Sequence, residues 1–476
     1  MKKNILKITC LAIATMFSSC SDYLDVVPED KILETKIYST ESGINNVLNG
    51  IYLDLFDEDA YGGNLTMTTV ESLAQRYSFP DNRSDDYVLV NYSYGEEYAR
   101  ETFDAMWSSM YSIILNLNDL IANVDKYQAL PEYKINIIKG EAYGLRAMLH
   151  FDLLRLFGPI YSTNPDDASI PYYTEAKAEN GKILPATEVM NAIIADLKQA
   201  EALLVNDAIR PEAEISNPEF FYIEERGLRF NFYAVKALQA RAYLYAGNTL
   251  EANAAAKVVI DEASTVFSWT NPTDVISAGG NPDRTFSSEV VFALHNIQLY
   301  ERHNDYFSSS LSNLEIYAPN STRLVNVFES NENDYRYNST WILPTTGGKS
   351  YKTFFKYADV DDARKSFRFR QPLIRISEMY YIVAETESDA AEGLQYLNTV
   401  RYNRGLVDLP AGTNMDAELR KEYQKEFFGE GQLFYYYKRK NINRIPNGSS
   451  SSRWSNKTMG PEQYVLPLPE SETKYQ

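Results

Sequence analysis

The feature that most constrains the fold is a series of long segments in which apolar residues recur every three or four positions. The clearest segment covers residues 134–157 and ends at Gly158-Pro159; its period runs through Ile138, Ala142, Leu145, Leu149, Leu153 and Leu156. This spacing gathers apolar side chains on one face of an α-helix, and a proline cannot continue a helix. The same pattern predicts further helices at 44–55, 101–126, 184–205, 373–386, 389–403 and 415–429. We therefore expect a mainly α-helical chain.

Two further predicted helices form a pair across a tight turn. They cover Asn231–Ala246 and Leu250–Glu262, and Gly247-Asn248 separates them. Small residues on both segments allow the two helices to approach closely: Ala237, Ala240, Ala252 and Ala255. This is the packing of a tetratricopeptide hairpin, although the sequence shows no strict repeat period. We therefore expect a tetratricopeptide-like scaffold of helical hairpins, wound as an α-α superhelix.

Two long segments, 59–100 and 265–370, lack the helical period and are rich in Gly, Asn, Asp, Ser and Tyr. We expect long irregular loops there with a few short strands, one of them within SSEVVFALHN at 287–296. Residues 21–38 are expected to be an extended leader. Irregular segments of this length inside a compact protein usually indicate a function or a wrong assignment of elements. The helices are therefore predicted to form a frame on which the irregular segments cluster.

The N-terminus has the pattern of a targeting segment. Three lysines precede the apolar stretch 8–17, which is followed by Phe17-Ser18-Ser19-Cys20. The stretch is too short for a membrane span, which needs roughly 20 apolar residues, but it suits a secretory signal. The four residues resemble a bacterial lipobox, so residues 1–19 are expected to be a lipoprotein signal peptide. Cys20 would then be the first mature residue and would carry acyl chains that anchor the protein to a membrane. The alternative is an ordinary signal peptide with an incidental cysteine.

The chain is acidic, with 65 Asp and Glu against 46 Lys and Arg, and loss of the three signal lysines would take its formal charge from -19 to -22. A basic nucleic-acid footprint is therefore absent, and binding to anionic lipid is disfavoured. The 37 tyrosines are the unusual number. Tyrosine combines an apolar face with a polar tip, which suits binding surfaces.

Motifs for cofactors, metals and catalysis are incomplete. GGKS at 347–350 lacks the glycine of a phosphate loop, since that position is Leu343. The acidic stretch that begins at Asp57 has Tyr61 and Thr68 at positions where a calcium loop needs ligands. The three histidines form no zinc motif, and no GxSxG elbow occurs. We expect no cofactor, no metal and no enzymatic activity, although a pair of carboxylates could cleave a glycosidic bond.

Several segments together resemble the SusD/RagB family of outer-membrane nutrient-binding lipoproteins. They occur in the family's order along nearly the whole chain: CSDYLDVVPED, STESGINNVLNGIYLDLF, MWSSMYSIILNLNDLI, GEAYGLRAMLHFDLLRLFGPI, ALQARAYLYAGN, SSEVVFALHN, RISEMYYIVAE, LNTVRYNRG, EYQKEFFGEGQLFYYYKRKN and YVLPLPESET. The resemblance implies a single SusD-like domain over 20–476. Its N-terminal part, about 20–330, and its C-terminal part, about 331–476, would be intertwined in one fold.

The resemblance also implies a function. Members of this family bind glycans, or in some cases peptides, at the cell surface, and they cap a SusC-like TonB-dependent outer-membrane transporter to which they pass the ligand. The helices would face the transporter and the irregular segments would build the ligand face. The expected protein is a lipid-anchored, surface-exposed outer-membrane protein that binds without catalysis and has no nucleic-acid partner. A peptide-binding protein, a lipid-anchored glycosidase and a pure scaffold for the transporter remain as alternatives.

The candidate ligand residues lie in the irregular segments. An aromatic ring can cover the apolar face of a sugar, while Asp, Asn and Arg can bind its hydroxyls. The predicted site consists of Tyr77, Asp81, Asn82, Arg83, Tyr92, Tyr94, Tyr300, Tyr306, Tyr317 and Trp341. Tyr92 and Tyr94 would share one face if that stretch is extended. The alternative for each tyrosine is packing over the edge of the core. Arg146 and Glu378, on predicted helices, are expected to be buried in ion pairs or caps.

Overall fold

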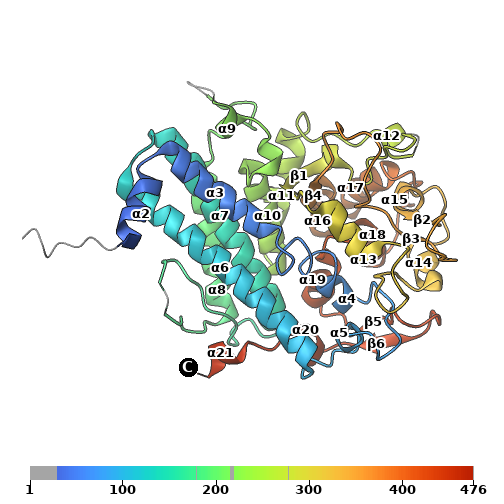
Figure 1. Ribbon diagram of the computed structural model, residues 1–476. Helices are drawn as coiled ribbons and strands as arrows, with labels where there is room; N and C mark the ends of the chain where they lie inside the picture. The colour runs from blue at the N-terminus through green and yellow to red at the C-terminus, as the bar shows by residue number, and fades with distance from the viewer. Residues whose placement is uncertain (1–28, 178, 215–218, 277, 475–476) are drawn as a thin grey trace, which may run out of the picture.

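Long helices of the N-terminal half lie side by side on the left of the molecule in the computed structural model (Figure 1). The structure describes residues 29–177, 179–214, 219–276 and 278–474, so the expected signal peptide and Cys20 lie outside it. The helices on this side are α2 (Glu29–Tyr38), α3 (Glu41–Leu55), α6 (Glu97–Tyr127), α7 (Glu132–Phe157) and α8 (Ala186–Leu203). Helix α7 packs between α6 and α8 and is buried on nearly all sides of its second half.

The predicted hairpin is confirmed as α10 (Phe232–Tyr245) and α11 (Thr249–Glu262). Gly247 has φ +80 in the turn, a conformation that favours glycine, and the side chain of Asn248 caps α11. Helix α11 also packs on α16 (Ile376–Thr386), which in turn packs on α17 (Ala390–Tyr402). The row of antiparallel helices therefore continues with segments from the C-terminal half. The expected mainly helical, tetratricopeptide-like fold is confirmed.

The irregular segments 59–100 and 265–370 lie mostly on the right of the molecule, whereas α9 (Phe220–Ile223) lies at the top and α21 (Glu470–Thr473) at the lower left (Figure 1). The other short elements before residue 370 are α4 (Thr69–Leu73), α5 (Tyr87–Val90), α12 (Pro272–Ile276), β1 (Val290–His295), α13 (Leu299–Phe307), α14 (Ser321–Val327), α15 (Tyr335–Thr340), β2 (Trp341–Ile342) and β3 (Thr353–Phe354). Those after it are β4 (Arg370–Arg375), α18 (Met415–Glu426), α19 (Gln432–Arg439), β5 (Arg444–Pro446), β6 (Asn456–Thr458) and α20 (Pro461–Tyr464). Two 3-10 turns lie at Arg226–Leu228 and Ser287–Glu289.

The strands form three two-stranded antiparallel sheets, β1–β4, β2–β3 and β5–β6, within the described residues. The predicted strand at 287–296 is confirmed as β1. Its partner β4 pairs Val290 with Arg375 and His295 with Arg370, so the sheet joins segments from both sides of residue 330.

Three predicted elements were wrong. Residues 29–38 form α2 instead of an extended leader, because Tyr38 is buried against α6, where it stacks on Tyr127 and donates to Asp119 Oδ2 at 2.6 Å. The segment 59–100 contains α4 and α5 rather than a strand, and α6 starts at Glu97. The apolar residues 373–374 belong to β4, not to a helix, because they pair with β1. A short apolar run fits a strand or a helix equally well, so its conformation depends on whether it pairs with another strand.

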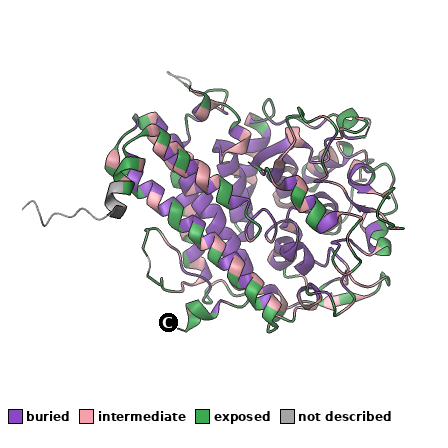
Figure 2. Ribbon diagram, viewed as in Figure 1, coloured by how far each residue is buried: buried purple, intermediate pink, exposed green. Residues whose placement is uncertain are grey.

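The core has two parts. The larger part lies between the long helices and β1–β4, and the buried residues continue from there into the loop-rich side (Figure 2). The second part, which we call the aromatic cluster, lies under the irregular segments and consists of Met67, Tyr77, Phe79, Val90, Leu299, Tyr306, Phe307, Tyr317, Leu324, Phe328, Tyr337, Trp341, Phe354, Tyr357 and Phe428. The loops are thus packed on a core of their own.

Two buried ion pairs join helices of the scaffold. Arg146 on α7 forms a bidentate pair with Asp196 on α8, with both bonds at 2.7 Å. Arg241 on α10 pairs with Glu378 on α16 at 2.5 Å. The prediction that Arg146 and Glu378 are buried ion-pair residues is confirmed.

A larger network of buried charges is centred on Glu426 at the end of α18. Its carboxylate oxygens lie 2.6 Å from Arg375, 2.6 Å from Arg404 and 2.8 Å from Arg336. Arg404 also binds Glu289 at 2.6 Å, and all five side chains are buried. Burial alone would raise the pKa of Glu426, but the three guanidinium groups hold it well below its usual range. We call this group the Glu426 network; it connects β4, α15, α18, the turn after α17 and the turn before β1.

The Glu426→Gln variant should lose about 3–5 kcal/mol of unfolding free energy, because three buried guanidinium groups lose the charge that neutralises them. Urea unfolding followed by circular dichroism measures this loss. The control is Asp362→Asn, whose carboxylate pairs with the 89% exposed Arg364 and should contribute little to stability. Equal destabilisation by the two substitutions would contradict the assigned role of the network.

Candidate functional site

Irregular segments that are distant in sequence meet at a surface on the loop-rich side. Tyr306 on α13 donates to Glu58 at 2.6 Å, and Tyr317 donates to Asp86 at 2.8 Å. The backbone N–H of Ser78 also donates to the carbonyl of residue 318 at 2.9 Å. These contacts bring together the two stretches in which the sequence predicted the ligand residues.

Two of the predicted ligand residues are fully enclosed. Tyr77 is 0% exposed and donates to the carbonyl of Met67 at 2.7 Å. Trp341 is 1% exposed and lies between the rings of Phe354 and Phe428, at 5.0 and 4.9 Å between centroids. Neither side chain has a free surface for a ligand. Both belong to the aromatic cluster. Their role is therefore packing in the core, and the predicted ligand role is wrong for these two residues.

The expectation of a shared extended face for Tyr92 and Tyr94 was also wrong. Tyr92 has φ +57, so the chain turns there, and the two rings meet edge to face at 6.1 Å. The Tyr92 hydroxyl donates to the carbonyl of Leu73 and the Tyr94 hydroxyl to that of Gln463, at 2.9 and 2.7 Å. Both tyrosines therefore fix the loop to the core.

The other predicted residues have access to solvent or lie at its edge. Asn82 and Arg83 are exposed in a turn, where Arg83 forms a bidentate pair with Asp81. Tyr300 is half-buried on α13, 4.9 Å from the ring of Phe369. Tyr306 and Tyr317 are 8% and 9% exposed, with ring centroids 5.7 Å apart.

The site is best described as a tyrosine–carboxylate cluster made of Glu58, Asp86, Tyr98, Tyr306 and Tyr317. The Glu58 side chain is 51% exposed and is oriented by Tyr306 and by Arg302, whose Nη1 lies 2.9 Å away. Tyr98, at the first turn of α6, lies against Asp86 and Tyr317. A carboxylate held in place by two donors keeps free lone pairs that accept hydrogen bonds from hydroxyl groups.

Glu58, Asp86 and Tyr98 were not among the predicted residues. The two carboxylates are hidden among 65 acidic residues, and neither is next to its tyrosine in sequence. Tyr98 lies in the same polar stretch as Tyr92 and Tyr94, at the start of the next helix. That position was the sequence signal that could have indicated Tyr98 as a site residue.

Asp86 differs from its neighbour Asp85 in burial. Burial raises the pKa of Asp86 to about 6, although the bond from Tyr317 lowers it. Asp85 is exposed. In the folded chain Asp86 therefore holds its proton at a pH where the unfolded chain has released it.

The Asp86→Asn variant should remove a pH dependence of stability. Because folding raises the pKa of Asp86, its contribution to the unfolding free energy falls as pH rises from about 4 to about 6. The wild type should lose on the order of 2–3 kcal/mol relative to Asp86→Asn over this window. Urea unfolding at several pH values measures the difference, and Asp85→Asn is the matched control. A constant difference between wild type and Asp86→Asn across this range would contradict the assignment.

A large groove of about 980 Å³ lies beside the first turns of α6. Its wall includes apolar side chains from α6, α7 and the C-terminal segment, among them Phe103, Phe157 and Leu466. Carboxylates outnumber cations on this wall. The carboxylates are those of Glu97, Glu101, Asp104, Glu462 and Glu470, and the one cation is Arg100. Burial and then the neighbouring Glu470 raise the pKa of Asp104, while Arg100 lowers it. The groove thus combines an apolar floor with excess negative charge.

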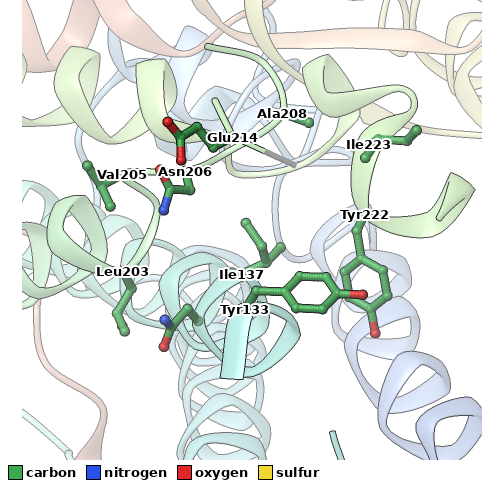
Figure 3. A pocket seen from close by; sticks show the side chains of 10 residues that line it. Tyr133, Ile137, Leu203, Val205, Asn206, Ala208, Glu214, Tyr222 and Ile223 are labelled. Atoms are coloured by element: carbon green, nitrogen blue, oxygen red, sulfur yellow. The ribbon is translucent and has the colours of Figure 1, made fainter. Parts of the chain in front are cut away.

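A smaller pocket of about 100 Å³ lies between α7, α9 and the end of α8 (Figure 3). The rings of Tyr133 and Tyr222, with centroids 6.5 Å apart, form one of its walls.

Within the described residues no group of three or more His, Cys, Asp or Glu is placed to hold a metal ion. No helix in the described part of the chain is long and apolar enough to span a membrane.

Two family models match this chain. The first, described as "starch-binding associating with outer membrane" and SusD-like, matches residues 22–215, and the second, the SusD/RagB model of the SusD family, matches residues 301–475. SusD-like protein P25 of Formosa agariphila is 25% identical over 288 residues, which are 58% of this chain and 49% of the relative. SusD-like protein P2 of the same organism is 27% identical over 208 residues, 42% of this chain and 38% of the relative. The chain thus matches half or less of the length of these relatives.

Solved structures share the fold over nearly the whole chain. A SusD superfamily protein from Bacteroides thetaiotaomicron has a TM-score of 0.70 at 20% identity and covers 92% of this chain and 98% of its own. A SusD-like carbohydrate binding protein from Bacteroides vulgatus has a TM-score of 0.66 at 18% identity, with 91% and 96% covered. A laminarin binding SusD-like protein has a TM-score of 0.64 at 19% identity, with 91% and 97% covered.

Proposed function

Because this chain belongs to the SusD/RagB family, we propose that it is a glycan-binding lipoprotein of the outer membrane, anchored through Cys20 and exposed at the cell surface. In this proposal it captures oligosaccharides or polysaccharides without cleaving them and delivers them to a SusC-like TonB-dependent transporter. The family model described as starch-binding and the carbohydrate-binding structural neighbours support a glycan as the ligand.

The observation that carries the proposal is the oriented carboxylate of Glu58 in the tyrosine–carboxylate cluster. Sugar recognition needs fixed acceptors for hydroxyl groups and aromatic surface for ring faces. Glu58 is held by Tyr306 and Arg302 but remains half exposed, so its geometry is set before a ligand arrives. A binding site that is already ordered loses less conformational entropy when it binds.

The scaffold gives a reason for dividing the roles between the two sides of the molecule. The helices α3, α6 and α8 carry exposed residues on the helical side of the molecule, and in this proposal that side faces the transporter. The loops are packed on the aromatic cluster and present their polar edge away from it.

Binding to a glycan panel should be detectable with the soluble chain that begins at Ser21, and the glycans should be recovered intact. Glu58→Gln should weaken binding about tenfold, because it replaces a charge-assisted acceptor by a neutral one. Isothermal titration measures affinity, and Glu188→Gln, an exposed glutamate on α8, is the control. Unchanged affinity in Glu58→Gln would show that the tyrosine–carboxylate cluster is not part of the glycan site. Release of glycan cleavage products would instead indicate a glycosidase.

The acidic groove beside α6 favours a second candidate, a peptide ligand. Its five carboxylates, one arginine and apolar floor would suit an extended peptide with basic and apolar side chains. The double variant Glu101→Gln/Asp104→Asn should then weaken binding of a lysine-rich peptide severalfold, and most at low salt. Fluorescence anisotropy measures this binding, with Glu188→Gln as the control. Equal binding by wild type and the double variant would exclude the groove as a peptide site.

A further inference from the structure

The hairpin β5–β6 displays an exposed tryptophan. Trp454, in the loop between its strands, is 76% exposed. The other three tryptophans are covered: Trp107 and Trp341 are 3% and 1% exposed, and Trp269 is half-buried. Leaving most of an indole in water forgoes the stabilisation that burial would give. The sequence neighbours of Trp454 in the loop are serines, an arginine and an asparagine, none of which is apolar.

The loop that carries Trp454 is held by a buried arginine. Arg323 on α14 is 9% exposed, and its guanidinium donates to the carbonyls of Ser450, Ser452 and Ser455 at 3.1, 2.6 and 2.6 Å. A fourth bond, to the carbonyl of Arg453, is 3.4 Å long. Among the described residues no carboxylate pairs with Arg323, and its guanidinium binds backbone carbonyls of the loop instead. The backbone on either side of the exposed indole is therefore held in place.

The hairpin is joined to the segment that carries the candidate site. The backbone N–H of Phe79 donates to Ser449 Oγ at 3.1 Å, and that of Gly448 donates to Gln75 Oε1 at 3.1 Å. Lys457 on β6 donates to Asn91 Oδ1 at 2.7 Å, next to α5. The loop with Trp454 thus borders the same surface as residues 75–91, which include Asp86 of the tyrosine–carboxylate cluster.

The sequence of the hairpin carries charge of the opposite sign to that of the whole chain. Residues 444–458 contain three Lys and Arg and no Asp or Glu, although the formal charge of the chain is -19. The guanidinium of Arg453 lies 4.6 Å from the centroid of the Trp454 ring. No carboxylate lies within ion-pair distance of Arg453 in the part of the chain that the structure describes. Its donors are free for an anion.

We propose that Trp454 and Arg453 form a subsite for an acidic sugar residue, one that carries a carboxylate or a sulfate. The pyranose ring stacks on the open face of the indole, and the guanidinium of Arg453 binds the anionic substituent through two parallel hydrogen bonds. This proposal rests on the proposed glycan binding and specifies one class of sugar for it. A lipid surface also attracts Trp and Arg, but insertion needs several apolar side chains together, and the hairpin offers one.

The test uses the soluble chain from Ser21 to Gln476 with acidic and neutral probes: an oligogalacturonate, a sulfated galactan oligosaccharide and a neutral β-glucan oligosaccharide. Titration should show Trp454→Ala at least tenfold weaker than wild type for an acidic probe. Arg453→Gln should lose about tenfold for that probe, lose part of the salt dependence of binding, and leave neutral probes unchanged. Tyr402→Ala, which removes another exposed aromatic side chain, 74% exposed at the end of α17, is the matched control and should bind as wild type.

Tryptophan fluorescence supplies a readout that does not depend on affinity. Trp454 is the most exposed tryptophan, so it should account for most quenching by acrylamide, and the acidic probe should protect it. Circular dichroism checks that each variant is folded. If the wild type binds glycans and Trp454→Ala binds them as tightly as Tyr402→Ala does, this subsite is overturned and the proposed function remains intact. Absence of all glycan binding would overturn both, and protection by phosphatidylglycerol vesicles but not by sugars would replace the sugar with a lipid surface.

Discussion

The neutralisation of buried charge around Glu426 is the constraint on which the loop-rich side of the molecule depends. Burying an ion costs several kcal/mol unless its partners are placed correctly, so such a network tolerates few arrangements. Its members come from β4, α15, α18 and the turns next to α17 and β1, which are otherwise separated by irregular chain. Because these elements can satisfy their charges only together, the network sets where the segments between them begin and end.

The number of tyrosines follows from the same architecture. Irregular segments cannot bury their backbone as a helix does, and a side chain with a large apolar ring and a polar tip can cover a loop and bind its carbonyls at once. Tyr77, Tyr92 and Tyr94 each donate to a backbone carbonyl at least ten residues away in sequence. Tyr306 and Tyr317 instead donate to carboxylates, the half-exposed Glu58 and the buried Asp86. Within the irregular segments, Tyr306 and Tyr317 differ in this way from the tyrosines that bind backbone.

The helices could be predicted because their period is a local property, and α7, α10 and α11 agree with the prediction. Residues 29–38 and 373–374 could not, since contacts with α6 and β1 decide their conformation. For the site, the sequence located the two segments but not the side chains. Whether Trp341 is enclosed or Trp454 exposed depends on which rings from distant segments fill the aromatic cluster. No pattern within either segment contains that information.

The electrostatics of the surface are compatible with the proposed acidic ligand, although the protein is itself acidic. Charges that are more than about 10 Å apart in water are largely screened at an ionic strength near 0.1 M. A bound sugar would therefore respond mainly to nearby groups, which at the β5–β6 hairpin include Arg453. The net negative charge slows the approach of an acidic polysaccharide, while the local guanidinium stabilises the bound state. Because a polysaccharide repeats its units, one strand can contact the hairpin and the neighbouring cluster together, and modest contacts at each would then add up.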